Sequence, residues 1–270
     1  MRCMKSMSRS VVASIIAGAC TLLSGVAHAH TPYLIAVSDE AARGGVVSLD
    51  ASFAETFFAA DAAFDNSEFF VVQPDGSRAE PEQLVTLKTR TVAEVALTQE
   101  GTYRISTGMR QGAVFTFFKH EGKDGRVMGL DAPIPEGAVV TQQFQSLTQA
   151  DTYVSYKTTS DKALKVDDKG LQIEPLKNPS TLFPGQVFAV RVLLNGEPVK
   201  ALELSLYHAC RDGSKKPVVL TTDDNGVASL TLAKGRYLLR ARKRVAAPES
   251  AKVPLYSYTT TLSFDVFKKS

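Results

Sequence analysis

Two of the four histidines in this 270-residue chain lie one residue apart near its beginning, at His28 and His30. Imidazole nitrogens are preferred ligands of late first-row transition metals. A free α-amine beside a histidine adds a second nitrogen donor, because its pKa of about 7.7–8.0 lets a metal displace the proton near neutral pH. If the mature chain begins at one of these histidines, its first residues form a candidate site for Ni(II), Co(II) or Cu(II).

The segment before these histidines reads as a cleaved signal peptide, residues 1–29. Positive charges lie within residues 1–10, an apolar stretch covers 11–26, and Ala27-His28-Ala29 has the small-x-small pattern of a cleavage site. Cleavage after Ala29 makes His30 the first residue, whereas cleavage after Ala27 leaves His28-Ala29-His30. In the second case the amine, two backbone amides and the His30 ring form a square-planar nitrogen set that suits Cu(II) or Ni(II).

This segment implies that the protein is exported from the cytoplasm. Ala17-Gly18-Ala19-Cys20 loosely resembles a lipidation site, but the apolar core continues past Cys20, which favours cleavage over a lipid anchor. Of three cysteines only Cys210 lies clearly beyond the signal, so no internal disulfide is possible and packing must hold the fold. No later apolar run has spanning length, so we expect no transmembrane helix in the mature chain.

The charge balance argues against two classes of partner. The signal contains three of the 31 basic residues and no acidic one, so its removal leaves 28 residues of each sign. A near-neutral protein offers no general electrostatic attraction for nucleic acid or an anionic membrane. We therefore expect no nucleic-acid partner.

The two other histidines, His120 and His208, are further candidate ligands. His120 follows the strand-like run Phe115–Phe118 and is either a second ligand near the N-terminus or an exposed turn histidine beside Glu121; the residues favour the turn. His208 and Cys210 share a strand face and could pair as imidazole and thiolate. No second cysteine exists to close a tetrahedral site, which favours a buried structural rim.

A row of arginines, at 236, 240, 242 and 244, occupies one face of a predicted strand. Such a row suits a partner's acidic surface, but a solvated sheet face with acids on neighbouring strands is the commoner arrangement. The sequence contains no nucleophile elbow, phosphate-cradling glycine loop or paired-histidine helix, so we expect no enzyme.

The elements that position these residues read as strands. Short β-rich runs at 46–49, 69–72, 84–88, 92–97, 103–106 and 113–118 are separated by turns such as Pro74-Asp75-Gly76. This spacing is typical of an antiparallel sandwich. Residues 54–64 are alanine-rich with paired phenylalanines and suggest a short helix or an ordered loop.

A second strand-rich set follows an irregular, glycine-rich and polar stretch at 119–168. Phe188, Val190, Val192 and Leu194 alternate before an Asn195-Gly196 hairpin turn, and about seven strands complete this half. We therefore predict an all-β chain of two tandem β-sandwich domains, immunoglobulin-like or transthyretin-like, at 30–160 and 169–270, with a linker at 161–168.

Several segments of the second half carry a family resemblance: Gly170–Pro179, Pro184-Gly185, Asn195–Val199, Thr222–Gly226 and Tyr256–Phe264. Together they resemble a bacterial periplasmic family, domain-of-unknown-function family 4198, grouped with nickel and cobalt uptake components. The resemblance covers most of the mature chain. It implies a two-domain β-rich exported protein associated with transition-metal uptake, with a ligand carried over to His30 and, less directly, to His28. The aromatic usual after that histidine is Tyr33 here.

These observations predict a periplasmic, non-enzymatic transition-metal binding protein that assists uptake, with an inner- or outer-membrane transporter as candidate partner. One alternative is an interaction module that binds protein or glycan, since sandwich folds do not decide function. Another is a copper enzyme with an N-terminal histidine brace. Metal stoichiometry distinguishes the metal-binding protein from the interaction module. Turnover with a reductant and oxygen distinguishes it from the copper enzyme. The oligomeric state is not predicted.

Overall fold

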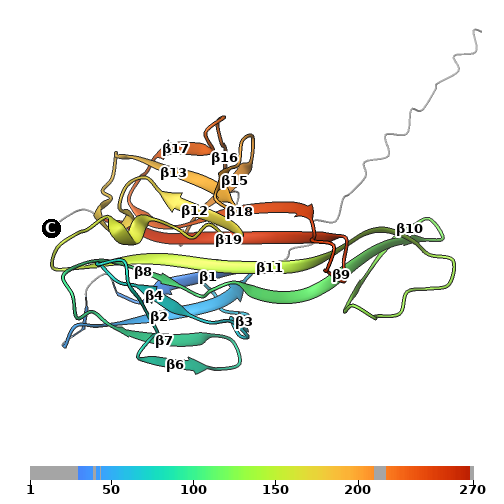
Figure 1. Cartoon of the computed structure of the whole chain (residues 1–270), viewed down its shortest axis with the longest axis horizontal. Helices are drawn as coiled ribbons and strands as arrows, with labels where there is room; N and C mark the ends of the chain where they lie inside the picture. Colours follow the sequence, from blue (N-terminus) through green and yellow to red (C-terminus); the bar gives the residue numbers. More distant parts are fainter. Residues whose placement is uncertain (1–29, 39–40, 43, 210–216, 268–270) are drawn as a thin grey trace, which may run out of the picture.

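The computed structural model describes residues 30–38, 41–42, 44–209 and 217–267. Within these ranges the regular structure is almost entirely β, with strands β1 to β19 and two short 3-10 helices, so the predicted all-β class is confirmed (Figure 1). The predicted signal peptide, residues 1–29 with His28, lies outside the described residues, as does Cys210. No helix in the described part of the chain has the length and apolar character needed to cross a membrane.

The strands form three sheets. The N-terminal sheet has the order β1-β2-β7-β6, with β3 on β2: Thr31–Ala36, Val46–Ala54, Thr91–Ala96, Gln83–Thr86 and Ala62–Ala63. The C-terminal sheet contains β12, β13, β14 and β17: Leu171–Pro175, Val187–Leu194, Glu197–Pro198 and Val227–Thr231.

The central sheet has ten strands and contains segments from both halves of the chain. Its main path is β16-β15-β18-β19-β11-β8-β4-β5: Val218–Thr221, Glu203–His208, Gly235–Ala246, Leu255–Val266, Val139–Tyr156, Gly101–Ser106, Phe70–Val72 and Arg78–Ala79. A hairpin of β9 (Arg110–His120) and β10 (Lys123–Met128) joins β11 and forms an arm that extends beyond the two smaller sheets (Figure 1).

The two smaller sheets cover opposite faces of the central sheet (Figure 1). One core lies between the central and C-terminal sheets and includes Phe188, Leu204 and Leu262. The other lies between the central and N-terminal sheets and includes Leu34, Leu49 and Ile105. Because alternate strand residues point to opposite faces, the central strands contribute side chains to both cores. The molecule therefore has three layers, with the central sheet packed between the two smaller sheets.

The central sheet joins strands from both of the predicted domains. Strand β11 of the first half pairs in parallel with β19 of the second, with Ala150 opposite Thr261. The segment 161–168 contains the 3-10 helix η1 (Lys162–Leu164), and a second, η2 (Pro179–Thr181), follows β12. Independent folding of 30–160 and 169–270 stays a prediction.

One stretch differs from the sequence expectation. Residues 119–168 were expected to be mostly irregular, but they contain β10 and the 18-residue strand β11. Within 54–64, where a short helix or an ordered loop was expected, the structure has a loop and the two-residue strand β3. In the arm, β10 alternates between exposed and partly buried residues, so it lacks the apolar alternation by which strands are recognised.

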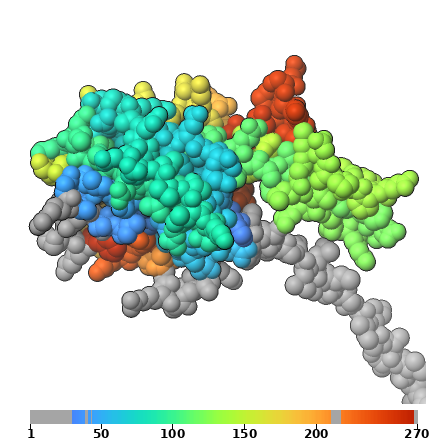
Figure 2. Space-filling view, turned by 90° about the horizontal axis from the view of Figure 1, so that it is seen from below, coloured from blue at the N-terminus to red at the C-terminus, as the bar shows by residue number. Residues whose placement is uncertain are grey.

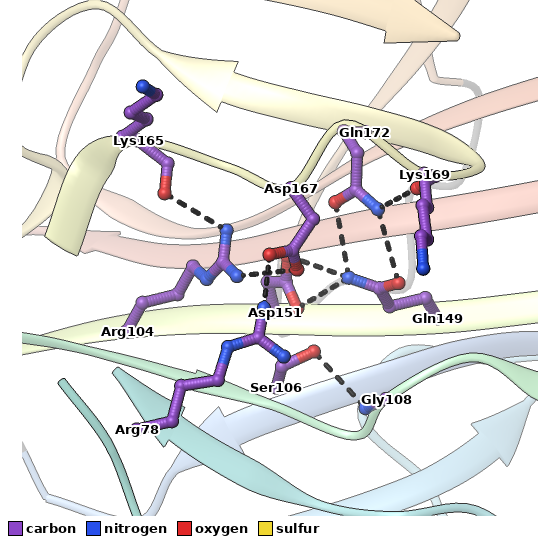
Figure 3. Close-up of polar contacts among 10 residues, drawn as sticks. All are labelled: Arg78, Arg104, Ser106, Gly108, Gln149, Asp151, Lys165, Asp167, Lys169 and Gln172. Carbon is purple, nitrogen blue, oxygen red and sulfur yellow. Dashed lines mark hydrogen bonds and ion pairs between the residues drawn. The ribbon is translucent and has the colours of Figure 1, made fainter. Parts of the chain in front are cut away.

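A buried polar network lies where the two halves meet (Figure 3). Arg104 of β8 is only 1% exposed. Its Nη2 donates to Asp167 Oδ2 at 3.0 Å and its Nη1 to the carbonyl of Lys165 at 3.3 Å, and Arg78 also contacts Asp167. A strand of the first half is thereby attached to the segment that leads into the second.

The same network continues along β11. Asp151 is 3% exposed and accepts a hydrogen bond of 3.2 Å from Gln149, whose amide also lies 3.2 Å from the Gln172 side-chain oxygen on β12. Burial raises the pKa of Asp151, and the charge of Arg104 opposes that rise. The buried acid and the buried arginine therefore depend on each other for compensation of their charges.

Candidate functional site

The first described residue, His30, directly precedes β1, a strand whose six residues are all buried. Two contacts fix the start of β1 against the central sheet. The Thr261 hydroxyl donates to the Pro32 carbonyl at 3.0 Å, and Arg240 Nη1 donates to Thr31 Oγ1 at 3.1 Å. His30 is therefore attached to a rigid element and its position follows from β1.

The His30 ring meets a carboxylate. Its Nε2 lies 3.2 Å from Glu55 Oε1, and the two side chains are 44% and 50% exposed. The pairing follows from the register of the β1–β2 hairpin, in which Thr31 is opposite Ala54, so His30 and Glu55 are the next cross-strand neighbours. An imidazole nitrogen and a carboxylate oxygen thus converge at an edge open to solvent.

The loop after Glu55 is held in place by hydrogen bonding and aromatic packing. The Glu55 amide donates to Asp61 Oδ2 at 2.8 Å. Phe58 packs edge-on against Tyr33 with ring centroids 5.2 Å apart, and the Phe57 ring lies 4.4 Å from that of Tyr207 on β15. These contacts restrict where the Glu55 carboxylate can lie relative to β1.

The donor set fits a late first-row metal in part. In the described residues no group of three or more His, Cys, Asp and Glu side chains converges, so His30 and Glu55 supply two ligands. An α-amine created by cleavage before His30 would supply a third. Two nitrogens and one oxygen suit Ni(II), Co(II) or Cu(II) and leave coordination positions open.

Sequence reasoning missed Glu55. Its only signal is the pairing of 31–36 with 46–54, and alternation in two short strands does not determine their relative register. The hydrophobic pattern places residues on faces, whereas the cross-strand partner of His30 depends on the number of residues in the connecting loop.

The structure does not bring His120 to His30. His120 lies at the tip of the arm, opposite Lys123 across the β9–β10 turn. Pro32 of β1 is hydrogen-bonded to Thr261, which is opposite Ala150 of β11. Lys119, next to His120, is opposite Val139 of the same strand. Ala150 and Val139 are eleven residue steps apart along β11, which is about 36 Å at 3.3 Å per residue. The turn interpretation of His120 agrees with this placement.

His208 is exposed at the end of β15, so the predicted buried rim is wrong for this residue. Its ring stacks on that of Tyr237, with centroids 4.6 Å apart and an interplanar angle of 13°. The apolar face of Leu204 and Leu206 is buried as expected, but the strand leaves the core before His208. The proposed pairing with Cys210 concerns a residue outside the described part.

The arginine row also differs from expectation. Arg236 has the cross-strand acid that was predicted for the whole row, since its Nη2 lies 2.8 Å from Asp265 Oδ2. The other three, Arg240, Arg242 and Arg244, have no carboxylate within 4.0 Å among the residues with described positions. Their face is therefore not a charge-balanced sheet surface.

Comparison with known proteins identifies a family and little else. The profile of the family described as "Domain of unknown function (DUF4198)" matches residues 27–245. No curated protein sequence matches the chain.

Solved structures with some similarity include the D0-D1 domain of Intimin, 16% identical over 86% of this chain and 97% of that one, with a TM-score of 0.21. The titin domains z1z2 in complex with telethonin are 10% identical over 89% of this chain and all of that one, with a TM-score of 0.19. At such TM-scores the likeness carries no functional argument, and the architecture is defined by the strand pairing described above.

Proposed function

We propose that this chain, which belongs to the DUF4198 family of domains of unknown function, is an exported, non-enzymatic periplasmic protein that binds one late first-row transition metal at its N-terminal edge. The metal is cargo, and the protein assists its uptake. One observation carries the proposal: the 3.2 Å approach of the His30 ring to the Glu55 carboxylate at an exposed edge.

Chemistry and rigidity both support a metal at this position. Imidazole, carboxylate and amine are donors for Ni(II), Co(II) and Cu(II), whereas Mg²⁺ and Ca²⁺ prefer sites built from oxygen. The ligand pair needs no folding step, because β1 is buried along its whole length and the Glu55 loop is packed on aromatic rings. An exposed, incomplete ligand set favours an ion that is received and passed on.

Titration calorimetry with NiCl2, CoCl2 and CuCl2 on the protein purified after export tests the proposal. We expect one ion per chain with at least one of these salts, and no heat of binding with MgCl2. His30→Ala and Glu55→Gln should each weaken binding tenfold or more, because each removes a ligand. His120→Ala is the matched control and should leave the affinity unchanged, since His120 lies at the arm tip.

The terminal amine is tested separately. One extra residue before the mature N-terminus displaces the amine but keeps every side chain, so it should weaken binding if the amine is a ligand. Affinity should also fall at acid pH, because protons compete for the same lone pairs. Absence of binding in the native protein, or binding unchanged in both His30→Ala and Glu55→Gln, would refute the site.

A further inference from the structure

Three arginines of β18, Arg240, Arg242 and Arg244, point to the same face of the central sheet because they occupy alternate positions. The hydrogen bonds that they donate go to neutral oxygens only, at 2.9–3.2 Å: those of Thr31, Ser205, Thr259 and Gln142. A guanidinium has five N–H donors. These bonds use two donors of Arg240 and one each of Arg242 and Arg244, so most of the donors form no hydrogen bond with the described residues.

The charge of this row is uncompensated within the described residues, where no carboxylate lies within 4.0 Å of the three guanidinium groups. Arg242, partly buried between the other two, shows the consequence: burial, followed by the charges of Arg240 and Arg244, lowers its pKa to about 10. Neighbouring like charges destabilise a folded sheet. The described part of the chain therefore leaves the positive charge of the row unbalanced, and a partner with negative charge would balance it.

The row continues onto the arm through aromatic rings. Arg244 lies 4.5 Å over the Phe144 ring, and Phe144 packs on Phe115 with centroids 5.6 Å apart. Arg126, exposed on β10, lies 5.8 Å over Phe115. Figure 2, a view from the side of the N-terminal sheet, shows the arm, in green, projecting beyond that sheet. We call Arg240, Arg242, Arg244 and Arg126 the arginine strip.

We propose that the arginine strip is the docking surface for an acidic segment of a partner protein, bound in extended conformation with carboxylates on alternate residues. The arginines of β18 repeat every second residue, or about 6.8 Å, which is also the repeat of alternate side chains in any extended strand. Arginine and carboxylate form strong charge-assisted pairs, often with two parallel hydrogen bonds.

Other anionic ligands fit the strip less well. A single phosphate ion matches one or two guanidinium groups and leaves the rest of a row about 14 Å long without a partner. Single-stranded nucleic acid needs open aromatic faces for its bases. Here Arg244 and Arg126 lie over Phe144 and Phe115, and those rings also pack on each other. An extended peptide with carboxylates on alternate residues directs all of them toward the strip, so that each can meet an arginine.

The test uses fluorescence anisotropy with the exported protein, in chelator so that the result is independent of metal. One labelled peptide alternates glutamate and valine over eight residues, and a control peptide has the same composition with its glutamates contiguous. We expect the alternating peptide to bind at least tenfold more tightly. Arg242→Gln and Arg244→Gln should each weaken that binding tenfold or more, since each loses a charge-assisted pair.

Lys243→Gln is the matched control, because it removes one positive charge from the same strand on the opposite face. It should change the affinity less than twofold. Circular dichroism reports whether each variant folds, and the exposed Arg244 supplies a second variant if Arg242→Gln does not. Equal binding of the two peptides, an equal effect of Lys243→Gln, or full competition by millimolar phosphate or oligo-dT would overturn the proposal.

Discussion

Replacing Arg104 with methionine should destabilise the protein by an amount that depends strongly on pH. Arg104 and Asp151 are 1% and 3% exposed, and the charge of Arg104 opposes the burial that raises the pKa of Asp151. Methionine fills similar space without charge, so Asp151 would become a buried acid without its counter-charge. Asp167, the carboxylate that Arg104 contacts directly, is 31% exposed and retains Arg78.

Removing one partner of a buried ion pair costs about 3–5 kcal/mol. Among the described residues the carboxylate within 4.0 Å of Arg104 is that of Asp167, so Arg104 acts on Asp151 through its charge at longer range. We expect the lower end, about 3 kcal/mol at pH 7, because Gln149 still donates to Asp151. An acid whose pKa is higher in the folded than in the unfolded state adds stability below its unfolded pKa, about 3.9. That stability is lost as the pH rises through the folded pKa. Without Arg104 the folded pKa of Asp151 rises further, so the cost of the substitution should be small near pH 4 and should grow toward neutrality.

Urea unfolding followed by far-ultraviolet circular dichroism measures the free energy of unfolding. Wild type and Arg104→Met are compared near pH 4 and at pH 7. The double variant Arg104→Met, Asp151→Asn should recover most of the loss at pH 7, because it removes the unpaired charge. A loss under about 1 kcal/mol at pH 7, or the same loss at both pH values, would refute the assignment of Asp151 and Arg104 as mutually dependent charges.

Two further predictions concern single positions. Burial, followed by the charge of Asp50, raises the pKa of Tyr33 to about 12. A raised pKa means that wild type should lose up to about 2.7 kcal/mol as the pH rises from about 10 to 12. Tyr33→Phe should lack this loss in urea unfolding at the two pH values; the same loss in both proteins would contradict the prediction. At Gly108, where φ is +69°, an added Cβ would lie 2.3 Å from the Glu68 carbonyl oxygen. Gly108→Ala should therefore lower the melting temperature well below that of Gly76→Ala, which has φ of +89° and nothing within 4 Å; equal melting temperatures would contradict the clash.

The sequence was most informative where one face of a strand is buried. Phe188, Val190 and Val192 alternate with less buried residues on β13, and the structure buries these three as the pattern predicts. The Asn195-Gly196 turn also lies where expected, with φ of +52° and +83° at its two residues. Here local pattern and tertiary burial agree, so period-two alternation is sufficient.

The same reasoning failed on the arm and on long-range pairing. Strand β11 has exposed or partly buried ends and a fully buried middle, so no single alternation covers its 18 residues. Its parallel pairing with β19 joins residues more than a hundred positions apart. No local signal encodes such a contact, and this is why one shared sheet was not foreseen.

Site prediction followed the same division. His30 could be proposed as a ligand because cleavage signals are local in sequence, whereas its pairing with Glu55 depends on the register of β1 and β2. The shared face of the arginines was predicted from spacing alone. Their lack of acids was not, because Arg240 and Arg242 are opposite Thr261 and Thr259 on β19, and those partners are known only once the strands are paired.

Strand β1 connects the two proposed sites and also keeps them separate. Arg240, at one end of the strip, donates to Thr31, the residue that follows His30. Successive side chains of a strand point to opposite faces, so Thr31 faces the arginines while His30 lies toward Glu55 on β2. A metal at His30 and an acidic segment on the strip would therefore use different groups on opposite sides of one rigid strand. The Arg244 and Glu55 substitutions consequently test the two proposals without disturbing each other.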